Sequence, residues 1–92
     1  MHEMGIASSV LEAVGKEMER YPGRRVVKVG LRIGEFAGVD TESLKFCFEV
    51  ISKSSELAPI ELDLTWCRVE DGLSGEELDL AYLELEDEEL PT

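Results

Sequence analysis

The stretch RRVVKVGLRIG, residues 24–34, decides the fold. Apolar side chains occupy every second position, and polar residues or glycine fall between them, which is the period of a β-strand with one buried face. The apolar positions are Val27, Val29, Leu31 and Ile33. Gly30 leaves the other face without a side chain at its middle, as is common where a second backbone or a helix lies close. The stretch therefore predicts a strand whose outer face lies close to another element.

A helix is predicted before this strand. Over residues 4–21 apolar side chains recur three or four positions apart, while charged side chains take the other face. The apolar positions are Ala7, Val10 or Leu11, Val14 and Met18. The sequence Tyr21-Pro22-Gly23 then ends the helix, because proline cannot continue the hydrogen-bond ladder and glycine permits a sharp reversal.

A second helix is predicted after a corner at residues 34–38. Asp40 or Thr41 caps its first turn, since a short side chain with an oxygen accepts hydrogen bonds from the unpaired amides there. Helical spacing then gives an apolar stripe that we expect in the core. The stripe comprises Leu44, Cys47, Phe48 and Ile51, and it is widened by Phe46 and Val50.

Two further strands complete the predicted fold. IELDLTW, residues 60–66, alternates regularly, whereas EELDLAYLELE, residues 76–86, shifts its apolar phase after Tyr82. Such a shift predicts a β-bulge or a strand covered on both faces. The order helix, strand, helix, strand, strand predicts an α+β domain with two helices covering a three-stranded sheet. We expect the last two strands to form an antiparallel hairpin, while the relative direction of the first two stays open.

The acidic charge lies in the second half of the chain. The 92 residues carry a net charge of −12; residues 47–92 hold fourteen acidic and two basic side chains, whereas seven of each cancel in residues 1–46. This balance argues against nucleic acid, whose phosphates need a basic counter-surface, and against anionic membranes. With no apolar run of transmembrane length and no cleavable leader, the sequence predicts one cytoplasmic domain.

The only histidine stands at position 2, in the opening sequence Met1-His2-Glu3. The terminal amine and the His2 amide nitrogen close a five-membered chelate around a metal, and that amide and Nδ1 of His2 close a six-membered one. Nitrogen-rich tetragonal sites of this kind favour Ni(II) or Cu(II). Glu3 or another acid supplies a fourth ligand. On position alone, a histidine near a terminus is more often a solvated side chain than a ligand.

The opening MHEMGIASSVLEAV and the later VVKVGLRIGEFAGVDTESLKFCFEVISKSSELAPIELDL together resemble the HypA/HybF family of hydrogenase nickel-incorporation proteins. The shared features are the Met-His-Glu start, a strand ending in Ile-Gly-Glu, a Gly-Val-Asp turn, a Leu-x-Phe-x-Phe helix and a closing Ser-Gly-Glu-Glu-Leu-Asp-Leu strand. The resemblance covers residues 1–66 and 74–86.

The resemblance implies a nickel metallochaperone. Such proteins carry Ni(II) and cooperate with the GTPase HypB to load the large-subunit precursor of a [NiFe]-hydrogenase, and sometimes to supply urease. The family's nickel residues fall on Met1, His2 and Glu3, and in some members on the acid of the Gly-Val-Asp turn, here Asp40. Asp40 also serves as a helix cap, and the two roles are equally expected.

The sequence departs from the family between the last two strands. Relatives insert a zinc domain with two Cys-x-x-Cys pairs there, whereas this chain has a short loop at residues 67–75 with the single thiol of Cys67. One thiolate cannot build a tetrahedral structural zinc site, so no structural zinc is expected. The expected organisation is a nickel-binding domain over residues 1–86, interrupted by that loop, and an acidic tail at 87–92.

Nickel delivery is therefore the leading functional hypothesis. The alternative is an interaction or regulatory module that keeps the fold but does not deliver metal, offering a polar surface around Arg24, Arg25, Lys28 and Arg32. An enzyme is not expected, because the sequence has no nucleophile with a partnered base and no phosphate-binding glycine loop. The open strand edge that a missing zinc module leaves is compatible with a monomer or a weak homodimer.

Overall fold

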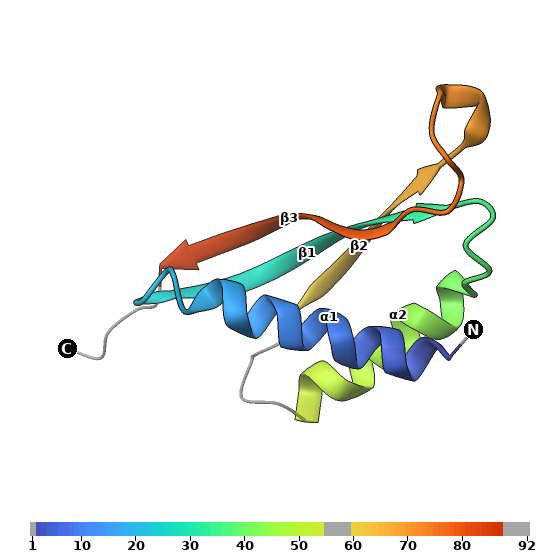
Figure 1. Ribbon diagram of the computed structural model, residues 1–92. Coiled ribbons are helices and arrows are strands. Elements are labelled where there is room, and N and C mark those ends of the chain that lie inside the picture. The colour runs from blue at the N-terminus through green and yellow to red at the C-terminus, as the bar shows by residue number, and fades with distance from the viewer. Residues whose placement is uncertain (1, 55–59, 88–92) are drawn as a thin grey trace.

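The computed structural model describes residues 2–54 and 60–87, which form two helices and a three-stranded sheet (Figure 1). The elements in chain order are α1 (Glu3–Met18), β1 (Arg24–Gly34), α2 (Thr41–Ser54), β2 (Glu61–Cys67), the short 3-10 helix η1 (Val69–Asp71) and β3 (Leu78–Asp87). The predicted α+β class and the predicted order of elements are confirmed. Helix α1 begins one residue earlier than expected and ends three residues earlier, at Met18.

Strand β1 lies in the middle of the sheet, in the order β2-β1-β3. It pairs in parallel with β2 and antiparallel with β3. The predicted hairpin between the last two strands is therefore wrong, because β1 separates them. The segment β1-α2-β2 is a βαβ unit, whose helical crossover brings the second strand back parallel to the first. The chain then passes to the opposite edge of β1, where β3 pairs.

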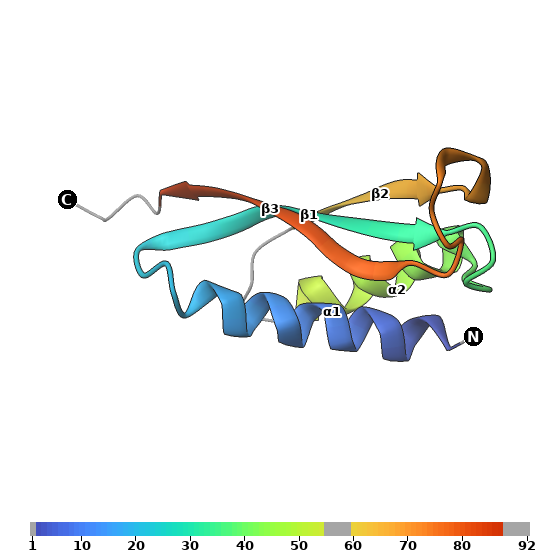
Figure 2. The ribbon, with the colours of Figure 1, turned by 45° about the horizontal axis from the view of Figure 1, so that its top comes forward.

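Both helices cover the same face of the sheet (Figure 2). The inward side chains of β1 form the centre of the core: Val29, Leu31 and Ile33 are at most 2% exposed. The helices contribute Ala7 and Val14 from α1 and Leu44 and Phe48 from α2. The core therefore confirms the predicted inward row of β1 from Val29 onward and the predicted centres of both helical stripes.

The apolar stripe of α2 is narrower than the sequence indicated. Phe46 is 66% exposed and Val50 is 43% exposed, so the prediction that they extend the core is wrong. Cys47 is partly buried and packs at the edge of the core. Among the described residues, α2 packs mainly against α1 and β2, and Phe46 lies outside these contacts.

Two β-bulges shift the pairing of β1 with β3. The register moves between Gly30 and Leu31, leaving Ala81 without an opposite residue on β1, which confirms the bulge predicted from the phase shift in the last strand. A second shift lies between Val26 and Lys28, so Val27 is the extra residue there. As a result Val26, at 4% exposure, takes the core position that the alternation had assigned to Val27.

A ladder of ion pairs joins β1 to both of its neighbouring strands. The ion pairs are Arg24–Asp87, Arg25–Glu86, Lys28 with both Glu61 and Glu84, and a two-pronged pair of Arg32 with Asp79. The Glu61 carboxylate, followed by that of Glu84, raises the pKa of Lys28. The basic side chains of the first half of the chain thus meet acidic side chains of the second half.

The ring of Tyr82 fills the space above Gly30. A Cβ atom at Gly30 would overlap the Tyr82 ring, so the close element predicted here is an aromatic side chain rather than a backbone or a helix. The Tyr82 hydroxyl donates a hydrogen bond across β1 to Asp63 on β2. This hydrogen bond is the main cause that raises the pKa of Tyr82. One glycine therefore lets an aromatic side chain join the two edge strands.

Candidate nickel site at the amino terminus

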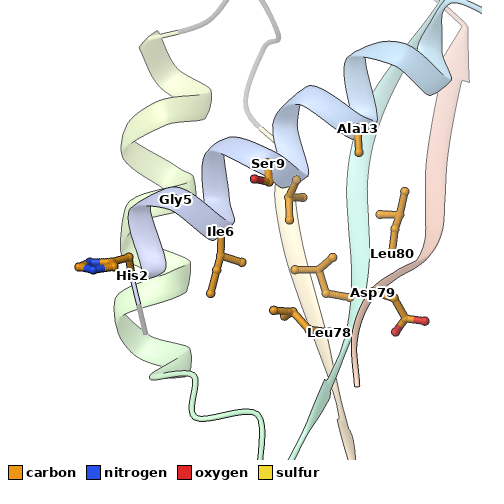
Figure 3. A pocket seen from close by; sticks show the side chains of 10 residues that line it. His2, Gly5, Ile6, Ser9, Ala13, Leu78, Asp79 and Leu80 are labelled. Atoms are coloured by element: carbon orange, nitrogen blue, oxygen red, sulfur yellow. The ribbon is translucent and has the colours of Figure 1, made fainter. Parts of the chain in front are cut away.

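The first turn of α1 presents His2 and Glu3 at one end of the molecule. His2 is the N-cap residue, with an extended backbone (φ −83°, ψ 93°), and its carbonyl accepts the first helical hydrogen bond, from the Ile6 amide at 3.1 Å. His2 is exposed, and in Figure 3 its imidazole points away from Leu78 and Leu80 on β3. Met1, the third predicted ligand residue at this end, lies outside the described residues.

The position of His2 leaves the first backbone amides of the chain uncommitted to the helix. The first four N–H groups of an α-helix have no intrahelical acceptor, and the amide of Glu3 is one of them. The His2 amide precedes the helix altogether, and hydrogen bonding along α1 starts at Ile6. A metal that takes the His2 or Glu3 amide nitrogen therefore breaks no hydrogen bond of α1.

The fold brings Glu3 next to Asp40, although 37 residues separate them in the sequence. The Asp40 backbone N–H donates to Glu3 Oε2 at 3.5 Å, a long hydrogen bond. The two residues start α1 and α2, whose first turns lie side by side at the end where the chain begins (Figures 1 and 2). Helix N-termini carry partial positive charge and favour carboxylates. Two of the predicted nickel residues, Glu3 and Asp40, are thus in contact with each other.

Asp40 acts as the N-cap of α2. Its Oδ1 accepts hydrogen bonds from the Glu42 N–H at 3.1 Å and the Ser43 N–H at 3.2 Å, and its carbonyl accepts from the Leu44 N–H at 2.9 Å. This confirms the capping role predicted for Asp40 rather than for Thr41. Both side-chain bonds use the same oxygen, so the cap does not engage Oδ2. Within residues 2–54 and 60–87, no three His, Cys, Asp or Glu side chains form a preassembled metal cluster.

The connection between β2 and β3 is short and tied to the end of β1. The Ser74 hydroxyl and the Ser74 and Gly75 amides donate to the Glu77 carboxylate at 2.6–2.9 Å, and the Ser74 hydroxyl contributes most to lowering the Glu77 pKa. Gly34 N–H donates to the Glu77 carbonyl at 2.7 Å. Residues 68–77 contain η1 and turns and form no zinc ribbon. Cys67, the thiol at the start of this connection, is 2% exposed.

An apolar groove runs beside the start of α1, and no pattern in the sequence predicted it directly. It has a volume of about 440 Å³ and lies between α1 and β3, with His2 at one end (Figure 3). Ile6 and Val10 line it on the helix, and Leu78 and Leu80 line it on the strand. The sequence feature nearest to it is the phase shift of the last strand, since the bulge that this shift predicts bends the strand locally.

No helix in the described parts of the chain, residues 2–54 and 60–87, is long and apolar enough to cross a membrane.

Comparison with known proteins matches residues 1–70 to a family described as hydrogenase/urease nickel incorporation, metallochaperone, hypA. Three relatives carry the name hydrogenase maturation factor HypA. The protein of Chlorobium phaeobacteroides is 43% identical over 70 residues, that of Desulfatibacillum aliphaticivorans 40% over 65, and that of Methanopyrus kandleri 41% over 66. These matches cover 76%, 70% and 70% of this chain, but only 60%, 50% and 46% of the relatives. The matched region is thus about half of the relatives' length.

Proposed function

Because the chain belongs to the HypA family of hydrogenase/urease nickel-incorporation metallochaperones, we propose that it binds Ni(II) as cargo at its amino terminus and delivers it during maturation of a nickel enzyme. The family is one of metallochaperones, so the chain handles the metal rather than catalysing a reaction on it. The acceptor we propose is the large-subunit precursor of a [NiFe]-hydrogenase, or alternatively urease, with a HypB-type GTPase as partner in the cytoplasm.

The proposed ligands are the amine of Met1, the amide and Nδ1 of His2, and an oxygen of Glu3 or Asp40. The α-amino group has an ordinary pKa of about 7.7–8.0, so part of it is unprotonated at neutral pH. Together with the His2 nitrogens it forms two fused chelate rings in one plane. Nitrogen-rich tetragonal coordination of this kind suits Ni(II) and discriminates against Ca²⁺ and Mg²⁺.

The observation that supports the proposal is the contact between Glu3 and Asp40. This contact lies at the start of α1, where the His2 amide donates no hydrogen bond within the helix. The Glu3 carboxylate supplies negative charge in the residue after the His2 nitrogens, and the His2 amide precedes the hydrogen bonds of α1, so a metal can take it without disturbing the helix.

The same features suit release. His2 is exposed, and only its carbonyl takes part in the first hydrogen bond of α1, so its imidazole and amide nitrogens can leave the metal one at a time without unfolding the core. An acceptor that offers thiolates, which are softer ligands than amine and carboxylate, then takes nickel stepwise. The rest of the domain serves to hold this segment in an accessible position.

Calorimetric titration of nickel tests the proposal. The chain with Met1 as its first residue is compared with His2→Ala, with a chain that has one residue added before Met1, and with Glu12→Gln as a matched control on the exposed side of α1. We expect one Ni(II) per chain, with affinity lost in the first two variants and retained in the control. Equal affinity in all four proteins would contradict the proposed ligands.

A second candidate is an interaction module that keeps the fold without delivering metal. The apolar groove between α1 and β3 favours it, because exposed apolar surface of this kind is typical of protein-binding sites. The four basic side chains first considered for such a role on β1 are instead engaged in ion pairs across the sheet. Partner binding that is identical with and without nickel would favour this candidate over delivery.

A further inference from the structure

Strand β3 has an open edge and an apolar groove along the same side. In the sheet order β2-β1-β3, β3 is bonded to β1 on one side, and no other strand of the described residues adjoins its second side. An edge strand of ten residues presents a row of backbone N–H and C=O groups to any extended segment that approaches. Its length is enough for several pairs of hydrogen bonds with a fourth strand.

The groove follows β3 for much of its length. A second hollow of about 270 Å³, bounded by Tyr21 on one side and by Leu83 and Leu85 on the other, shares Leu80 with the groove described above. Leu78 and Leu80 are 38% and 36% exposed, although they lie on the face of the sheet that the helices cover. The core thus leaves apolar positions open at alternate residues beside the strand edge (Figure 3).

The charges of β3 decide which segment fits. The strand carries Asp79, Glu84, Glu86 and Asp87 and no basic side chain. A second copy of β3 would place carboxylates opposite carboxylates, which is destabilising. The basic residues of β1 approach these carboxylates from one side, and at Glu84 a single Lys28 is shared with Glu61. Asp79, Glu86 and Asp87 each have one basic partner on β1, so the incompletely balanced negative charge lies at Glu84, where a basic side chain of a segment at the free edge can add to Lys28.

From these observations we propose that β3 is a docking edge for an extended segment of a partner protein in which apolar and basic residues alternate. The segment adds as a fourth strand, with its apolar side chains in the groove beside Leu78 and Leu80 and its basic side chains over the acidic outer face of β3. Strand addition of this type obtains affinity from main-chain hydrogen bonds and specificity from alternate side chains. The proposal does not depend on nickel binding.

The test is an NMR titration of the full chain, labelled with ¹⁵N, with an eight-residue peptide of alternating valine and lysine. We expect shifts of the backbone amides of residues 78–85. Three control peptides test charge, alternation and main-chain hydrogen bonding in turn. They are a peptide of alternating valine and glutamate, a block peptide of four valines followed by four lysines, and the alternating valine–lysine peptide N-methylated at alternate residues. Each control should bind at least about tenfold more weakly.

Two protein variants complete the test. Leu80→Lys should weaken binding of the valine–lysine peptide by about tenfold or more, since it places a charge in the groove. Phe46→Ser, which removes an exposed apolar side chain on α2, should leave binding unchanged. The proposal is overturned if no shift occurs up to about 1 mM peptide, if the block or N-methylated peptide binds equally well, or if the shifts map to α2. Every peptide control uses the unaltered chain, so these controls still test the proposal if Leu80→Lys does not fold.

Discussion

Substituting Asp40 separates its capping role from its proposed role at the nickel site. Asp40→Ala removes the oxygen that accepts from the Glu42 and Ser43 amides. Loss of an N-cap of this type costs about 1 kcal/mol, within a range of about 0.5–2. For a domain of this size, that corresponds to a fall of about 4–8 °C in melting temperature. Asp40→Asn keeps an oxygen in the same place, since asparagine caps about as well as aspartate.

The charge of Asp40 also interacts with the partial positive charge at the start of α2, a contribution of about 0.3–1 kcal/mol that salt screens. Unfolding by urea is therefore followed by circular dichroism in dilute buffer and in about 1 M NaCl, where the Debye length is about 3 Å. We expect Asp40→Asn to approach the original stability in high salt and Asp40→Ala to stay destabilised. Equal destabilisation of both variants in high salt would refute the capping argument.

The same pair of variants reports on the metal. Neither substitution removes the backbone N–H that Asp40 donates to Glu3. If the Asp40 carboxylate is a nickel ligand, both variants weaken nickel binding, although only Asp40→Ala weakens the fold. Full nickel affinity in Asp40→Asn would show that the carboxylate only caps α2, leaving Glu3 as the acidic ligand.

Two further predictions concern the sheet and its final loop. Gly30→Ala should destabilise the fold by about 1–3 kcal/mol in urea titrations, because the added methyl group displaces the Tyr82 ring. The matched control is Gly15→Ala on α1, where the added methyl group meets open space and should stabilise the fold by about 0.5–1 kcal/mol. Glu77 has a lowered pKa in the fold, so its charged form contributes stability above about pH 4.5 that is lost as the pH falls through the folded-state pKa. Glu77→Gln should therefore lower the urea midpoint at pH 7 but less at pH 3, and a pH-independent difference, or the same effect in Glu76→Gln, would contradict this reasoning.

Local periodicity was sufficient to predict the elements, because burial on one side imposes it directly. The alternation at Val29, Leu31 and Ile33 and the helical spacing of Leu44 and Phe48 identified core positions that the structure confirms. The phase shift in the last strand also predicted its bulge. These features depend on residues close together in the sequence, where geometry leaves few alternatives.

Sheet order could not be predicted in the same way. The alternation of β1 is equally compatible with an edge or a central position, and the short connection before β3 favoured a hairpin that does not form. The ion pairs of Arg32 with Asp79 and of Lys28 with Glu84 connect positions far apart in the sequence, and many other pairings of opposite charges were equally possible beforehand. The same holds for Glu3 and Asp40, whose meeting depends on how α1 and α2 pack.

The prediction that the buried stripe of α2 includes Phe46 and Val50 was wrong for a related reason. Phe46 is apolar and adjacent to core positions, yet it is 66% exposed. Sequence spacing gives the angle of a side chain around a helix, but the width of the covered sector depends on the neighbours. Those neighbours are set by the tertiary arrangement.

X-ray absorption of the nickel-loaded chain, with Met1 as its first residue, tests the central claim most directly. The account predicts a nearest shell of nitrogen and oxygen with the edge feature of planar four-coordinate Ni(II), and it predicts the loss of that feature in His2→Ala and when a residue precedes Met1. Sulfur in the nearest shell, or a six-coordinate oxygen shell that is the same in all three proteins, would contradict it.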